Sequence, residues 1–217
     1  INRQNKPLIN IKKINFSNYG YEKNLVKGEL FDKKFKILIN NNYNKINFKF
    51  LKTGITVDIN LNEIKKESTI SGILKSKLLN SKLKFNFDYD GEKIKIYNSY
   101  FRNKNLSLNN ESLITYRPFL YLDSIFQVED INIKIIKKID INRILTSKNL
   151  IKKIKAKNTI NFKSKIFSQN LIDDLYLNVD LAYGRLVYFK KISISENFFS
   201  CKGDINLLEE YPILHFD

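Results

Sequence analysis

Apolar residues alternate with Lys, Asn, Asp and Ser in a series of short runs along this chain. The clearest runs are Lys45–Phe50, Ile55–Leu61, Leu83–Tyr89, Lys93–Ile96 and Leu175–Leu181. A period of two is typical of a β-strand with one apolar and one polar face. Because many successive runs are separated by only a few residues, they predict an antiparallel sheet.

Turn-forming residues divide these runs. Asp90-Gly91 is the strongest hairpin signal, and Asn40–Asn44 and Lys52-Thr53-Gly54 are weaker ones. Further strands are expected at 7–17, 25–31 and 35–39, and residues 112–136 should be mostly extended. The sequence therefore predicts a mainly β protein with an extended, curved antiparallel sheet.

One segment has a different period. From 140 to 154, apolar residues recur at roughly helical spacing after Asp140, which is a suitable N-cap, and Lys152 and Lys153 suit the end of a helix. We expect one short helical insertion at 140–154. Terminal strands should fill 159–217, at Leu175–Leu181, Arg185–Phe189, Lys191–Ser195, Phe198–Lys202 and Asp204–Leu208.

The domain organisation is expected to be simple. No linker rich in Pro, Gly or Ser divides the 217 residues, so residues 1–217 are interpreted as a single β-rich domain. The chain begins at Ile1 and contains no Met, which predicts a fragment of a longer protein or a processed chain. Residues 26–66 weakly resemble residues 70–110, and the matching Gly28 and Gly72 indicate a bulge or a close backbone approach.

The net charge of +16 has two interpretations. It can mark a polyanionic partner, such as nucleic acid or an anionic membrane surface. It can also follow from the codons of a low-GC bacterium, because Lys, Asn and Ile are abundant whereas there are two Ala and five Arg. Lys alternates with Phe onto opposite faces of the strands, so no specific nucleic-acid partner is predicted. An anionic membrane surface stays a candidate partner.

Residues with catalytic potential are sparse. Cys201 and His215 are the only Cys and His, so they form no zinc pattern, and a Cys–His nucleophilic pair is the one remaining option. The acidic pairs, such as Asp173-Asp174, are adjacent in sequence and would point to opposite faces of a strand. We expect no enzyme activity, no cofactor and no metal site.

The apolar face of the strands is therefore the candidate functional feature. It can pack against a second layer as the core of a ligand-free structural or protein-interaction domain. It can instead form an open groove for an apolar ligand, and each buried methylene of an acyl chain would then contribute about 0.8 kcal/mol. The groove candidates are Ile46, Phe48, Phe50, Ile55, Val57, Ile59, Leu83, Phe85, Phe87, Ile94, Ile96, Leu175, Leu177 and Val179.

The C-terminal part resembles the corresponding region of AsmA-like envelope proteins, the group that includes TamB and YhdP. The similar residues are Ile172–Val179, Gly184-Arg185-Leu186, Ile192-Ser193-Ile194 and Cys201–Ile205. The run from Gly72 to Leu108 and the segment with Asp140 and Leu145 are similar in character. The chain departs from these proteins in its high Lys and low Ala content, and its residues do not include their N-terminal anchor helix, as we expect of a fragment of a longer protein.

The resemblance implies a location and a role. It implies the periplasmic part of an inner-membrane-anchored protein of a Gram-negative envelope. The implied partners are a phospholipid or another acyl lipid, together with other envelope proteins. The implied function is lipid binding, intermembrane lipid transport or outer-membrane assembly. The sequence leaves open which lipid is bound, in which direction it moves, the length of the parent protein and the oligomeric state.

Overall fold

The protein is a mainly β structure in the computed structural model, which describes residues 2–3, 6–7, 11–20, 24–30, 32–62, 69–117, 120–131, 151–163 and 172–217. The strands are β1 (Asn2–Arg3), β2 (Lys6–Pro7), β3 (Ile11–Ser17), β4 (Leu25–Leu30), β5 (Lys33–Ile39), β6 (Lys45–Phe50), β7 (Ile55–Leu61), β8 (Ile70–Leu78), β9 (Ser81–Tyr89), β10 (Lys93–Arg102), β11 (Leu106–Thr115), β12 (Leu120–Ile131), β13 (Ile154–Lys163), β14 (Asp174–Ala182), β15 (Arg185–Ile194), β16 (Asn197–Asn206) and β17 (Leu214–Phe216).

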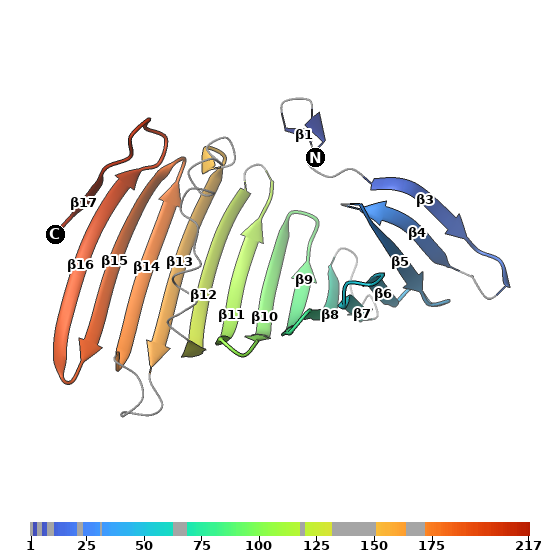
Figure 1. The fold of residues 1–217 in the computed structure, drawn as a ribbon, viewed down its shortest axis with the longest axis horizontal. Coiled ribbons are helices and arrows are strands. Elements are labelled where there is room, and N and C mark those ends of the chain that lie inside the picture. Colours follow the sequence, from blue (N-terminus) through green and yellow to red (C-terminus); the bar gives the residue numbers. More distant parts are fainter. Residues whose placement is uncertain are drawn as a thin grey trace.

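The strands from β3 to β17 form one 15-stranded sheet in which spatial order follows sequence order (Figure 1). The sheet is open, with β3 at one edge and β17 at the other, and β1 and β2 form a separate two-stranded ribbon. Strand direction changes gradually along the sheet, so the blue strands are steeply inclined to the red ones. The expectation of a mainly β, extended sheet is confirmed.

One strand pair is parallel. Leu120 is the partner of Ile154, and the register then runs in the same direction to Val128 and Phe162. The helix expected at 140–154 lies outside the described residues, except at its end. There Ile151 is helical and buried, whereas Ile154 already begins β13, ahead of the first strand position expected, Thr159.

Two strands near the C-terminus are longer than expected. Arg185–Phe189 and Lys191–Ser195 are one strand, β15, because the alternation of faces continues through Lys190. Phe198–Lys202 and the first part of Asp204–Leu208 are likewise joined in β16, which ends at Asn206, so Leu207 and Leu208 lie in the turn after it and not in the strand as expected. Gly203 does not end that strand, since it is paired directly with Tyr188. The shorter strands β6 and β7 have the predicted bounds.

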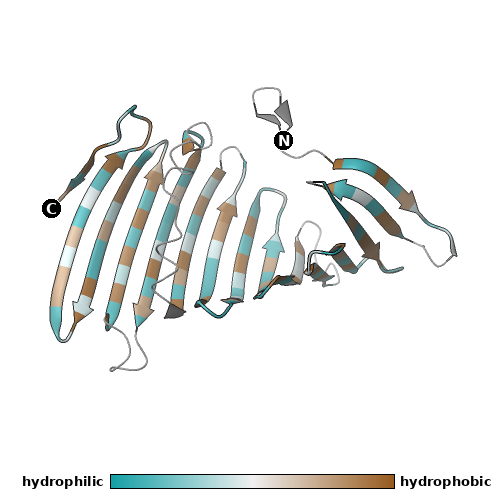
Figure 2. Ribbon diagram, in the orientation of Figure 1, coloured by the Kyte–Doolittle hydropathy of each residue, from teal (hydrophilic) through white to brown (hydrophobic). Residues whose placement is uncertain are grey.

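The strands form a single layer in the described part of the chain. No described side chain is less than 2% exposed, and the hydrophobic residues classed as buried there are Phe35, Ile151, Phe162 and Leu207. Hydrophobic and hydrophilic residues alternate along many of the strands (Figure 2), so the sheet has one mainly apolar and one mainly polar face. No helix within the described ranges has the length and apolar character needed to cross a membrane.

Candidate functional site: the apolar face of the sheet

The strand register places all the groove candidates on the same face. Residues that are direct partners on neighbouring strands point to the same side of a sheet. Phe48 is the partner of Val57, Ile46 of Ile59, and Phe87 of Ile96. Following the register through β8 and through β11–β13 brings Leu175, Leu177 and Val179 to that side as well. We call this side the apolar face and the other side the polar face.

A single line of partner residues crosses the apolar face from β3 to β16. Every member is directly paired with the next, and every member except one is hydrophobic. This apolar row consists of Phe16, Val26, Ile37, Phe48, Val57, Ser76, Leu83, Phe101, Leu108, Val128, Phe162, Leu175, Ile192 and Phe199. The exception, Ser76, donates its hydroxyl to the carbonyl of Thr56 at 2.9 Å.

Aromatic rings cluster on the apolar face of β5 and β6. The ring centroids of Phe35 and Phe48 are 5.6 Å apart, and those of Phe48 and Phe50 are 4.8 Å apart. Phe85 and Phe87 form a second pair at 6.4 Å on β9. These edge-to-face and stacked contacts between rings help to order the apolar face.

The glycines inside strands allow these rings to lie close to the backbone. Gly28 is the direct partner of Phe35, Gly72 of Phe87, and Gly203 of Tyr188. A Cβ atom at Gly28 would lie 2.7 Å from the ring of Phe35, and one at Gly203 would lie 2.7 Å from the ring of Tyr188. The close backbone approach expected at these glycines is present at Gly72, where a Cβ atom would lie 2.6 Å from the carbonyl oxygen of Asn60, whereas the close neighbour of Gly28 is a ring.

The apolar face also carries a polar cluster that the sequence reasoning missed, formed by Ser99, Asn110, Ser112 and Ser124. The Ser112 hydroxyl lies 2.8 Å from Ser124 Oγ and 2.9 Å from Asn110 Oδ1. Ser99 Oγ accepts a hydrogen bond from the Asn110 backbone N–H at 2.8 Å. Ser99 and Ser124 are 8% and 5% exposed, so this serine–asparagine cluster satisfies its own polar groups at the middle of the sheet.

The sequence reasoning also missed hydrophobic residues of this face, including Phe101, Leu108, Val128 and Phe162. The register shift in β10 between Tyr97 and Tyr100 changes the phase of the alternation, so Phe101 does not follow from Ile94 and Ile96 by counting in twos. The serine–asparagine cluster then interrupts the hydrophobic pattern of β11 and β12. The alternation in Leu106–Leu108 and Phe126–Val128 was the available signal.

The two residues considered for nucleophilic chemistry do not come together. Cys201 is paired with Lys190 on the apolar face, whereas His215 is paired with Asp204 on the polar face. Cys201 Sγ instead lies 3.6 Å from the hydroxyl of Tyr188, and this hydrogen bond raises the pKa of that tyrosine. In the described ranges, no cluster of three or more His, Cys, Asp and Glu residues could hold a metal ion.

A tyrosine pair caps the apolar face beside the Asp90-Gly91 hairpin. The Tyr116 hydroxyl donates to Tyr89 Oη at 2.6 Å and also contacts the carbonyl of Gly91. The hydrogen bond with Tyr89 is the main reason that the pKa of Tyr116 rises to about 12. These contacts connect Tyr116, which follows β11, to the hairpin between β9 and β10.

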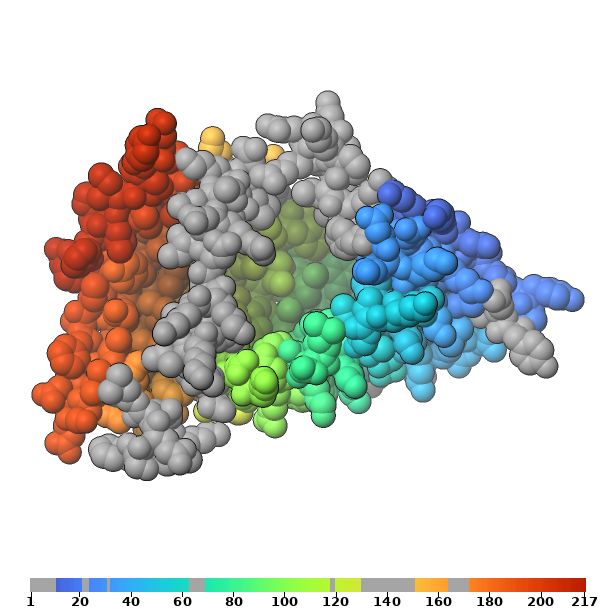
Figure 3. All heavy atoms as spheres, viewed as in Figure 1, coloured from blue at the N-terminus to red at the C-terminus, as the bar shows by residue number. Residues whose placement is uncertain are grey.

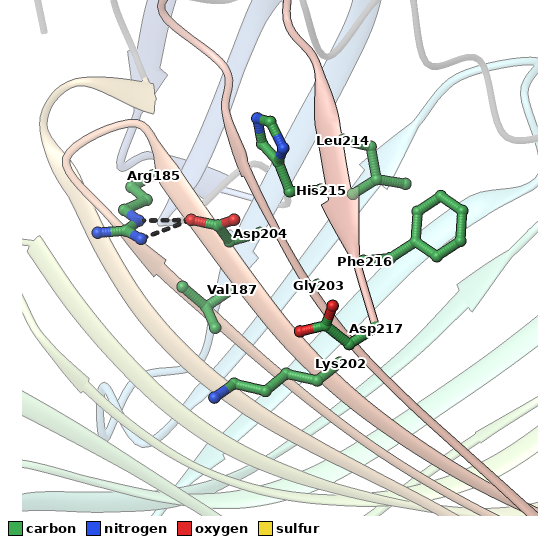
Figure 4. Close-up of a pocket in the computed structure, with 9 residues that line it drawn as sticks. All are labelled: Arg185, Val187, Lys202, Gly203, Asp204, Leu214, His215, Phe216 and Asp217. Atoms are coloured by element: carbon green, nitrogen blue, oxygen red, sulfur yellow. Dashed lines mark hydrogen bonds and ion pairs between the residues drawn. The ribbon is translucent and has the colours of Figure 1, made fainter.

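A concavity lies at the C-terminal edge of the sheet (Figure 4). It measures about 730 Å³ and is lined by Arg185, Val187, Lys202, Gly203, Asp204, Leu214, His215, Phe216 and Asp217. Arg185 Nε donates to Asp204 Oδ2 at 3.0 Å, so the charges of these two lining residues neutralise each other. In Figure 4, Leu214 and Phe216 point away from Arg185 and Asp204. This edge concavity is therefore distinct from the apolar face.

The molecule as a whole is hollowed between its two ends. In Figure 3, the green strands near the centre lie deeper than the blue and cyan strands on one side and the orange and red strands on the other.

No protein-family model, curated protein or solved structure matches this chain.

Proposed function

We propose that the apolar face binds the acyl chains of lipids and that the protein acts without catalysis. The observation that carries the proposal is the apolar row, to which 13 of 14 neighbouring strands contribute a hydrophobic residue. Most of its side chains are only half-buried in a single-layered sheet. A hydrophobic face of this extent is costly to leave in water, and it needs either a covering layer or a ligand.

The dimensions of the face suit hydrocarbon chains. Neighbouring strands are about 4.8 Å apart, so 13 steps along the apolar row correspond to roughly 60 Å. The hydrocarbon core of a bilayer is about 30 Å thick across two leaflets, so one acyl chain spans about 15 Å. The row is therefore several acyl chains long. This length is typical of a track along which a lipid can move, and it exceeds what a pocket for one lipid molecule needs.

The proposal includes a cellular setting. The resemblance of Ile172–Val179 and Cys201–Ile205 to AsmA-like proteins would place the sheet in the periplasm of a Gram-negative bacterium, as part of an inner-membrane-anchored protein. Lipid transport between membranes, or outer-membrane assembly, is the corresponding role. The alternative is a ligand-free structural or protein-interaction domain whose apolar face is covered by protein.

The test compares the same substitution on the two faces of the sheet. Ile59 and Ile73 lie on neighbouring strands, Ile59 on the apolar face and Ile73 on the polar face. Ile59→Asn should weaken binding of a fluorescent fatty acid by about tenfold, because a buried isoleucine contributes about 1.5 kcal/mol or more. Ile73→Asn should leave the affinity unchanged.

Native mass spectrometry and lipid extraction of the purified protein supply the second measurement. Co-purified phospholipid, released by extraction, is the expected result. A folded protein that carries no lipid and takes up no fluorescent fatty acid would favour the ligand-free domain. Equal losses in the Ile59 and Ile73 variants would show that the fatty acid does not bind the apolar face.

A further inference from the structure

A line of cations crosses the opposite, polar face of the sheet. It is defined by direct strand partners, with Thr56 as its one uncharged member. This lysine row runs through seven neighbouring strands and consists of Lys27, Lys36, Lys49, Thr56, Lys77, Lys82 and Arg102. It lies on β4–β10, at the N-terminal end of the sheet, and it includes no acidic residue.

Direct pairing of like charges makes the lysine row costly for the fold. Lys36 is the partner of both Lys27 and Lys49, and Lys77 is the partner of Lys82. Lys75 and Lys84 form a further like-charge pair beside the row. Cations directly opposite each other on neighbouring strands destabilise a sheet. A sequence selected only for folding would separate them.

The other end of the same face shows the opposite arrangement. On β13 and β14, Lys157 is the partner of Asp180, and Lys163 is the partner of Asp174. The register of β13–β16 contains no like-charge pair. Both ends share one genome and one codon bias, so a lysine-rich composition does not explain why cations face cations only toward the N-terminal end.

Four exposed lysines of the row are available to a partner, whereas Arg102 Nη2 already lies 3.5 Å from Glu129 Oε2. Lys36, Lys49, Lys77 and Lys82 are exposed, and none forms an ion pair with another described residue. Strands are about 4.8 Å apart, so the row from Lys27 to Arg102 covers roughly 29 Å. Lys75 and Lys84 lie in a parallel line beside the row and widen the positive patch, although the next residue of that line is Asp58, the other direct partner of Lys75.

We propose that this patch docks the N-terminal end of the sheet onto an anionic phospholipid membrane surface. Lysine ammonium groups act as point charges that need no fixed geometry, which suits mobile head groups. The row contains no aromatic residue on which bases could stack and no Asn or Gln that could read base edges, so nucleic acid fits less well. The docking surface lies opposite the apolar face, and it stands whether or not that face binds lipid.

The test uses two variants with the same change in net charge. The row variant carries Lys36→Gln, Lys49→Gln, Lys77→Gln and Lys82→Gln. The control variant carries Lys152→Gln, Lys157→Gln, Lys163→Gln and Lys202→Gln, which are exposed lysines outside the lysine row. Binding is measured by co-sedimentation with phosphatidylglycerol–phosphatidylcholine vesicles, with pure phosphatidylcholine vesicles as the uncharged comparison.

Each lysine near an anionic surface strengthens binding by about fivefold, so the row variant should bind on the order of 100-fold more weakly or worse. The control variant should lose at most about fivefold, and high salt should abolish binding of the unmodified protein. The row variant should also unfold at the same temperature or a higher one, since like-charge repulsion is removed. Weaker vesicle binding together with an unchanged or higher unfolding temperature would show that the lysine row binds the membrane and does not stabilise the fold.

Three results would overturn the proposal. Equal losses in the two variants would show that total charge, not the lysine row, attracts the vesicles. Failure of the unmodified protein to bind phosphatidylglycerol vesicles at low salt would exclude membrane docking. Tighter binding to a DNA duplex at the same salt concentration, lost in the row variant, would show that the patch serves nucleic acid instead.

Discussion

At the scale of single residues, glycine and aromatic residues act as pairs in this sheet. A glycine inside a strand weakens it, because it offers no side chain to pack and costs backbone entropy. Here each such glycine has an aromatic partner directly opposite, as in Gly28–Phe35 and Gly72–Phe87. The ring lies over the glycine and restores the missing contact, and Phe35 is only 5% exposed as a result.

The two pairs should respond differently to a methyl group. A Cβ at Gly28 would meet the ring of Phe35 at 2.7 Å, whereas one at Gly72 would meet the backbone carbonyl oxygen of Asn60 at 2.6 Å. We expect Gly28→Ala and Gly72→Ala each to lower the free energy of unfolding by about 1–3 kcal/mol. A shorter side chain opposite should rescue Gly28→Ala only.

Double-mutant cycles by urea unfolding measure that rescue. Phe35→Leu should offset most of the effect of Gly28→Ala, because the clashing atoms belong to the ring. Phe87→Leu should not offset Gly72→Ala, because the Asn60 carbonyl oxygen stays in place. Coupling energies of the same size in the two cycles would contradict the steric account.

At the scale of strands, the alternation of apolar and polar residues was enough to predict the bounds of strands in which it is regular. Lys45–Phe50 and Ile55–Leu61 were predicted with the bounds that β6 and β7 have. The alternation did not predict the bounds correctly where a residue that usually ends a strand is paired with a neighbouring strand. Lys190 and Gly203 look like breaks, yet both continue their strands because the partner strand holds them in register.

Long-range geometry was not available from the sequence at all. The parallel pairing of β12 with β13 depends on where the chain returns, which no local pattern encodes. Part of the apolar face could be predicted residue by residue, but its continuity as one row depends on the register of every strand pair. For the same reason the lysine row was visible only as a high net charge.

The serine–asparagine cluster should stabilise the pairing of β11 and β12. Ser112 and Ser124 are direct partners with their hydroxyl oxygens 2.8 Å apart, and Ser124 is 5% exposed. Removing one hydroxyl leaves the other without that partner in a confined place, so Ser124→Ala should cost about 1 kcal/mol of unfolding free energy. Ser112→Ala combined with Ser124→Ala should cost less than the sum of the two single changes.

Urea unfolding midpoints of the single and double variants provide the measurement. Ser200→Ala is the matched control, because Ser200 is exposed on the polar face, and it should change the unfolding free energy by less than about 0.5 kcal/mol. Strictly additive effects at Ser112 and Ser124 would mean that the two hydroxyls do not support each other.

At the scale of the whole molecule, the sheet is built like a linear repeat. All substantial contacts between strands of the described chain join neighbours in the sheet. Stability in such an architecture is approximately a sum over neighbouring units, so distant strands support each other only indirectly. The two ends can then carry different properties, with a cationic patch over β4–β10 and paired charges over β13–β16.

Damage at one end of the sheet should therefore stay at that end. Phe35 contacts Phe48 and Phe50, with ring centroids 5.6 and 6.5 Å away, so Phe35→Ala should remove about 3 kcal/mol of local stability. Hydrogen–deuterium exchange followed by mass spectrometry should show faster exchange in β4–β6 and unchanged exchange in β14–β16. Phe189→Ala is the control at the other end, because Phe189 is 40% exposed on β15 and contacts Tyr176, so any faster exchange should be confined to β14–β16. If Phe35→Ala accelerates exchange equally in all strands, the sheet unfolds as one cooperative unit, and its ends cannot be separately tuned for docking and for binding hydrocarbon.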